Sequence, residues 1–136
     1  METKIEMIGR HVLEYEPTLL HVRWVGSHTL DEQHQIYERI AAYVKANRPT
    51  LLMFDLRQAV SLTAEHRRAS ANWWKQQELE SIALAQYGLG PLLRVMVTLI
   101  ARAVALLSGR SVVLDNFANE ADARAWLEQI RPTLRV

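Results

Sequence analysis

Apolar and polar residues follow three kinds of spacing along the chain, and each predicts a different element. Leu20, Val22 and Trp24 are separated by single polar residues, which is the period of two expected of a half-buried strand. Residues 10–26 therefore predict two strands joined by a turn. The run TLLMFD at 50–55 is apolar throughout and ends in an acid, as is typical of a central strand buried on both faces.

Helical spacing predicts four helices, and two of them have clear start signals. Thr29 followed by Glu32 forms a capping-box pattern at the start of the first helix. Asn119 is a plausible cap for the last one, whose predicted buried face is Ala123, Trp126, Leu127 and Ile130. The four segments are 29–47, 63–80, 91–108 and 119–131. Further strands are expected at 81–88 and 111–117.

The resulting order is β-β-α-β-α-β-α-β-α. Strands that alternate with helices of this length predict an α/β fold with a single mixed, mostly parallel β-sheet flanked by about four helices, and an antiparallel pair at its start. With 136 residues and no linker or repeat, residues 1–136 are expected to form one domain.

The most apolar run, GPLLRVMVTLIARAVALLSG, raises a separate question. On a helical wheel Arg94 and Arg102 fall on one face, and the large apolar residues cover about 200° of the circumference, against a little over 100° for a helix packed on one sheet. Residues 91–108 are at the short limit for a membrane span, and both arginines lie on one face, so we expect no transmembrane helix. A neighbouring helix, a second copy of the chain, a hydrophobic ligand or a membrane surface would have to cover the excess.

Composition narrows the function classes. The net charge is +1 with acids and bases interspersed, which argues against a nucleic-acid binder. There is no cysteine, so disulfides and thiolate chemistry are excluded. The first residues do not read as a signal peptide, and we expect a cytoplasmic protein.

Three stretches carry a family resemblance. WVGSHTLDE before the first helix, LLMFDLR at the third expected strand and NFANEADARAWL near the end together resemble the SpoIIAA-like STAS superfamily, and more closely its small stand-alone bacterial members. The order of elements agrees from about Arg10 to Arg131. The resemblance implies a mixed sheet flanked by helices and a binding role without catalysis.

The resemblance does not extend to the phosphorylation switch of anti-sigma-factor antagonists. In those proteins a serine or threonine begins the helix after the third strand, and its phosphorylation breaks binding to a partner kinase. Asp55 matches the acid that ends the strand, but Leu56 and Arg57 stand where a hydroxyl–glycine signature would follow. Relatives of the stand-alone type are also described as similar to lipid-binding folds, which keeps a hydrophobic ligand as an alternative.

The segment DLRQAVSLTAEHRR is the candidate binding site. It follows a central strand, where open α/β sheets often bind ligands, and it leads into a helix N-terminus that offers free N–H groups. An anion or an acidic partner surface would fit there, although Thr63 could equally be an ordinary cap beside solvated arginines. The candidate residues are Asp55, Arg57, Ser61, Thr63, His66 and Arg67.

A second candidate surface is a protein interface. Trp73 and Trp74 lie about 100° apart on one helix, so one could pack in the core while the other contacts a partner; both could also straddle the sheet edge. The wide apolar face of 91–108 adds Val97, Ile100 and Val104.

The chain lacks the motifs of common catalytic, nucleotide-binding and metal sites, such as GxSxG, GxGxxG and HExxH. We therefore expect no enzyme activity, no cofactor and no metal. The sequence favours a regulatory or protein-interaction module, acting on a protein partner or as a homodimer. The alternative is a carrier or sensor of a small hydrophobic or lipid-like ligand.

Overall fold

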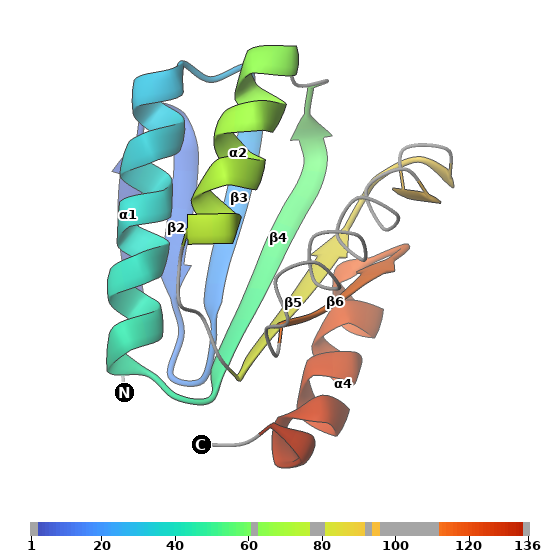
Figure 1. The fold of residues 1–136 in the computed structure, drawn as a ribbon. Coiled ribbons are helices and arrows are strands. Elements are labelled where there is room, and N and C mark those ends of the chain that lie inside the picture. The colour runs from blue at the N-terminus through green and yellow to red at the C-terminus, as the bar shows by residue number, and fades with distance from the viewer. Residues whose placement is uncertain (1–2, 61–62, 77–80, 92–93, 96–111, 135–136) are drawn as a thin grey trace.

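Six strands form one mixed sheet whose order follows the chain, β1-β2-β3-β4-β5-β6 (Figure 1). The computed structural model describes residues 3–60, 63–76, 81–91, 94–95 and 112–134. The first two pairings are antiparallel and the other three are parallel. The strands are β1 (Lys4–Ile8), β2 (His11–Tyr15), β3 (Leu20–Gly26), β4 (Thr50–Ala59), β5 (Ile82–Tyr87) and β6 (Val112–Phe117).

Strand β1 is the element that the sequence pattern did not predict. It pairs only with β2 and so forms one edge of the sheet. Two of its apolar residues, Ile5 and Met7, are more than half exposed, so the segment lacks the buried face that makes a strand recognisable. Gly9, with φ +61°, begins the two-residue turn to β2, a position that favours glycine.

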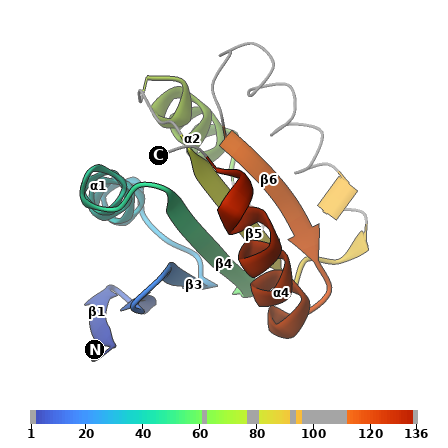
Figure 2. The ribbon, with the colours of Figure 1, turned by 90° about the horizontal axis from the view of Figure 1, so that it is seen from below.

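Three helices in the described residues cover the two faces of the sheet. Helices α1 (Leu30–Ala46) and α2 (Ala64–Gln76) lie side by side on one face, and α4 (Glu120–Ile130) lies on the other (Figures 1 and 2). A short 3-10 turn, η1 (Arg131–Thr133), follows α4. The predicted capping box is confirmed, because the Glu32 backbone N–H donates to Thr29 Oγ1 (3.1 Å) and the Thr29 N–H donates to Glu32 Oε1 (2.9 Å).

The alternation of side chains along the strands divides the core into two layers. Leu52 and Phe54 of β4 point to the α1 side, whereas Leu51 and Met53 point to the α4 side. The α4 layer is completed by Ala123 and Leu127, both fully buried, with Trp126 and Ile130 packed at its margin. The predicted buried face of the last helix is therefore confirmed.

The predicted fold class is confirmed: an α/β fold with one mixed sheet. The sequence predicted about four helices, and three lie within the described residues. At the predicted start of the segment 91–108, the Arg94 N–H donates to the Gly90 carbonyl (2.9 Å), which closes one helical turn. Residues 96–108 lie outside the described part. Of the helices in the described residues, none combines the length and apolar character that a membrane crossing needs.

Candidate functional site

A chain of polar side chains joins β3 to α4 across the end of β5. We call it the β3–α4 network, and it consists of Glu16, His21, Tyr87, Glu120 and Arg124. His21 Nε2 lies 2.9 Å from the Tyr87 hydroxyl, which in turn donates to Glu120 Oε1 (3.1 Å). Arg124 connects Glu120 (Nε to Oε2, 2.9 Å) with Glu16, which accepts two bonds of 2.9 and 2.7 Å. The network thus ties the β2–β3 hairpin to the last helix.

Strand alternation explains why this network lies on the α4 side. Leu20 and Val22 point into the α1 layer, so His21 between them points to the opposite face, and its side chain is completely buried there. Tyr87 reaches the same face from the last position of β5. Arg124 follows one turn after Glu120 on α4, which places both on one helix face.

The charges in the network shift the pKa of each acid. Hydrogen bonds from Arg124 hold the pKa of Glu16 below its ordinary value. Burial alone would raise the pKa of Glu120, but hydrogen bonds from Arg124 and Tyr87 outweigh it and lower the pKa. Burial, with help from Arg23, lowers the pKa of His21. At neutral pH the carboxylates are therefore ionised and the imidazole is neutral.

Asp55 and Arg57, two of the predicted site residues, form an ion pair beside this network. The Arg57 guanidinium donates two hydrogen bonds to the carboxylate of Asp55 (Nη2 to Oδ2 2.8 Å, Nε to Oδ1 3.1 Å). It also lies 5.6 Å from the centre of the Tyr87 ring. Burial would raise the pKa of Asp55, and the bonds from Arg57 reverse that shift. At Gly88, φ is +93° and a Cβ would meet the Arg57 backbone nitrogen at 2.8 Å, so only glycine fits this close approach.

Thr63, His66 and Arg67 lie on the α1 side of the sheet, away from Arg57. The His66 N–H donates to Thr63 Oγ1 (3.2 Å), the capping role that the sequence left open. The His66 ring bonds to the His28 carbonyl through Nε2 (2.8 Å) and packs edge-on against the His28 ring. Arg67 is exposed in the first turn of α2. The structure thus brings together Asp55 with Arg57 and Thr63 with His66, but it separates the two pairs.

His11 adds a buried imidazole next to His28 that the sequence did not single out. It is fully buried, and its Nδ1 accepts a hydrogen bond from the Val25 backbone N–H (3.0 Å). Burial, together with the neighbouring His28, lowers its pKa. Because Nδ1 already accepts the Val25 N–H, a proton can add to Nδ1 only if this hydrogen bond breaks.

We expect the free energy of unfolding to fall as the pH is lowered from 7.5 to 5.5. His11 binds a proton in the unfolded chain at an ordinary pKa of about 6.5, but resists it in the folded chain. The contribution of His11 to the free energy of unfolding is therefore complete above that pH and is lost progressively below it. Urea midpoints across this range measure the slope. His11→Gln should reduce the slope and leave the part that buried His21 contributes, whereas His34→Gln, at an exposed histidine, should keep it unchanged. A midpoint that rises on acidification, or a slope unchanged in His11→Gln, would contradict the prediction.

Both tryptophans of α2 pack against α1. The Trp73 ring stacks on Tyr37 (centroids 4.6 Å apart, planes at 15°), and Trp74 meets Trp73 edge-on at 5.0 Å. Both rings are partly buried against the α1 core layer. Their role in a partner interface stays a prediction. The other predicted site and interface residues, Ser61, Val97, Ile100 and Val104, lie outside the described residues.

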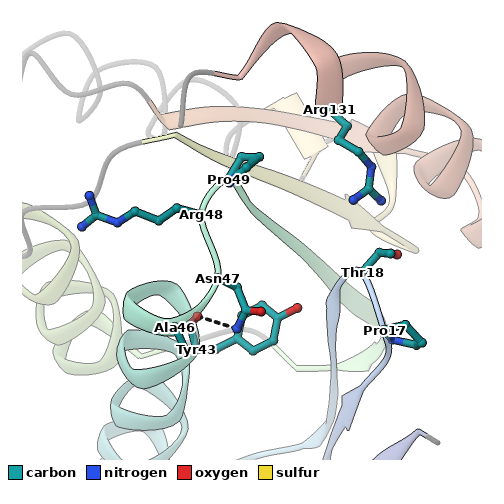
Figure 3. Close-up of a pocket in the computed structure, with 8 residues that line it drawn as sticks. All are labelled: Pro17, Thr18, Tyr43, Ala46, Asn47, Arg48, Pro49 and Arg131. Atoms are coloured by element: carbon teal, nitrogen blue, oxygen red, sulfur yellow. Dashed lines mark hydrogen bonds between the residues drawn. The ribbon is translucent and has the colours of Figure 1, made fainter. Parts of the chain in front are cut away.

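A hollow of about 360 Å³ lies between the β2–β3 turn and the residues that precede β4 (Figure 3). The β2–β3 turn, the end of α1 and η1 contribute its lining, which is Pro17, Thr18, Tyr43, Ala46, Asn47, Arg48, Pro49 and Arg131. This lining is mostly polar, and Arg131 is bonded to Glu128 (2.7 Å). It does not resemble the apolar cavity that the hydrophobic-ligand alternative requires.

Sequence reasoning missed the β3–α4 network. His21 was read as a residue of the polar face of a half-buried strand, yet it is fully buried. Its partners Tyr87 and Glu120 are distant in the chain, and nothing local to His21 indicates them. The available signal was Glu14, which the hairpin register places opposite His21, and Glu16, which follows in the turn after β2.

Comparisons with known proteins identify the fold. No protein-family model and no curated protein sequence matches the chain. A solved structure does: an uncharacterized protein of the DUF3478 family with a SpoIIAA-like fold, from Shewanella loihica PV-4. It superposes with a TM-score of 0.58 over 93% of this chain and 92% of that one, at 16% sequence identity. The chain has a SpoIIAA-like fold.

Both groups of site residues can now be placed on the SpoIIAA-like sheet. The β3–α4 network occupies the sheet face under the last helix, and the Asp55–Arg57 pair lies beside it within β4. The sequence predicted that this strand ends at Asp55, but pairing with β3 carries it on to Ala59, so Arg57 belongs to the strand and not to a loop. At 16% identity the likeness transfers an arrangement of strands and helices, and no residue roles.

Proposed function

We propose that this chain is a non-catalytic protein-interaction module that pairs with a second copy of itself through strand β1. The observation that carries the proposal is the exposed apolar strip on this edge strand, where Ile5 is 59% and Met7 58% exposed. Edge strands offer unpaired N–H and C=O groups, and proteins usually protect them with charge or a cover. Here β1 also carries exposed apolar residues, which favours pairing.

The charges on β1 suit pairing with an identical strand. Two antiparallel copies centred on Ile5 would place Lys4 of one copy opposite Glu6 of the other, and opposite charges at such positions stabilise a sheet. Glu6 stays ionised in this arrangement, because hydrogen bonds from Arg39 (2.9 Å) and Tyr15 (2.8 Å) hold its pKa below the ordinary value against the effect of burial. The strand is thus self-complementary.

The state of the ionisable groups supports a binding role over catalysis. A catalytic acid or base usually has a pKa near the pH at which the enzyme works, and it has room beside it for a substrate. In the described site, Asp55, Glu16 and Glu120 are each bonded to a guanidinium, which keeps them charged. The SpoIIAA-like fold is compatible with an interaction role, which we propose on these grounds.

Sedimentation velocity over a wide concentration range tests the proposal. We expect a reversible monomer–dimer equilibrium, and Met7→Glu should shift it to monomer because a carboxylate would be buried in the strip. Val60→Glu is the matched control, since Val60 is 49% exposed and lies beyond the end of β4. A wild-type chain that stays monomeric, or a Met7→Glu variant that dimerises like the wild type, would refute pairing through β1.

A further inference from the structure

The β2–β3 hairpin gathers three metal-binding side chains at one point beside the β3–α4 network. One carboxylate oxygen of Glu14 lies 3.6 Å from His21 Nδ1, and one of Glu16 lies 3.8 Å from it. The three ligand atoms lie within 4.8 Å of one another. Glu14 and Glu16 are about a fifth exposed, so this point is accessible from solvent.

The hydrogen bonds of the network favour one position for the proton on the His21 ring. Glu120 is ionised and can only accept, so the single hydroxyl proton of Tyr87 goes to Glu120. The Tyr87 oxygen must then accept from His21, which places the imidazole proton on Nε2. In the neutral ring Nδ1 is consequently a bare lone pair.

That lone pair faces the carboxylates of Glu14 and Glu16. His21 is completely buried, and its Nδ1 has no hydrogen-bond partner among the described residues. A buried acceptor directed at other acceptors is costly.

We propose that Glu14, Glu16 and His21 bind one divalent transition-metal cation of the zinc class. A nitrogen and two carboxylate oxygens form a ligand set that suits zinc. Ligands about 2.1 Å from a tetrahedral zinc lie about 3.4 Å apart, close to the 3.6 and 3.8 Å found here. The bond from His21 to Tyr87 and on to Glu120 is the outer support that metal-bound histidines typically have.

The local charges leave room for a cation. Glu14, Glu16 and Glu120 face two guanidinium groups, from Arg23 (3.6 Å to Glu14) and Arg124 (2.7 Å to Glu16), so one negative charge is unmatched. Each carboxylate oxygen has two lone pairs and can contact both an arginine and a metal. The metal would fasten the β2–β3 hairpin next to the last helix, apart from the β1 edge.

Isothermal titration calorimetry of the full chain with zinc chloride, after treatment with a chelator, tests this site. We expect saturable binding of one zinc per chain. Glu14→Gln should weaken it at least about tenfold, by analogy with the losses seen when groups around metal sites are changed. His34→Gln is the control, because the exposed His34–Glu38 pair (2.8 Å) is a plausible surface site for stray zinc and should not matter.

An NMR measurement of the histidine ring nitrogens keeps the test independent of any variant. The metal-free chain should show the His21 proton on Nε2, and zinc should shift the Nδ1 signal of His21. No zinc binding, binding that survives Glu14→Gln unchanged, or binding lost only in His34→Gln would overturn the proposal. A proton found on Nδ1 in the metal-free chain would do the same.

Discussion

Replacing Leu127 with alanine should lower the free energy of unfolding by about 2–5 kcal/mol, the range for truncating a buried leucine. Leu127 is fully buried between α4 and the sheet, where it packs with Leu51, Met53 and Ala85. The substitution removes its transfer free energy and leaves a cavity. The surrounding strands cannot close that cavity, because they are fixed by pairing on both sides.

Urea unfolding followed by far-UV circular dichroism measures this loss. The matched control is Leu30→Ala, the same substitution in the first turn of α1, where the side chain is 37% exposed; its effect should stay within about 0.5 kcal/mol. Equal effects at the two positions would mean that α4 does not cover the sheet as described.

Tyr87→Phe should cost about 1–3 kcal/mol, although it removes only one oxygen atom. The hydroxyl links His21 to Glu120, and its loss leaves the His21 Nε2–H without an acceptor in a buried position. The ring itself is retained, so the contact with Arg57 is unchanged. The loss is therefore one of polar pairing rather than of packing.

Tyr43→Phe is the control for this substitution. Tyr43 is a half-buried tyrosine packed against Tyr15, and its hydroxyl makes no hydrogen bond within the described residues. Removal of that hydroxyl should change stability by less than about 0.5 kcal/mol. If the two variants unfold at the same urea concentration, the β3–α4 network does not stabilise the fold.

Local patterns in the sequence were enough to predict most of the fold. The capping box at Thr29, the cap at Asn119 and the buried face around Leu127 depend on residues within one or two turns, and the structure confirms each. Strand β1 could not be predicted in this way, because an edge strand with exposed apolar residues has no regular alternation of buried positions. Its register depends on the Gly9 turn and on β2.

The site was harder to predict because its contacts are distant in the chain. His21 and Tyr87 are 66 residues apart, and Glu16 and Arg124 are 108 apart. No spacing rule within a strand or helix relates such residues; only the sheet order does. Of the predicted site, Asp55 with Arg57 and Thr63 with His66 were brought together because each pair is separated by two or three residues.

The position of α4 after all six strands has a consequence for synthesis of the chain. Synthesis proceeds from the N-terminal end and a domain generally folds as a unit, so the α4 side of the sheet cannot be completed until α4 has been made. Until then, Leu51, Met53 and Ala83 lack the cover that Ala123 and Leu127 give them, and Glu16 has not met Arg124. The nascent chain therefore passes through a stage in which these apolar residues lack their α4 partners, and exposed apolar surface at that stage favours aggregation or binding to a chaperone.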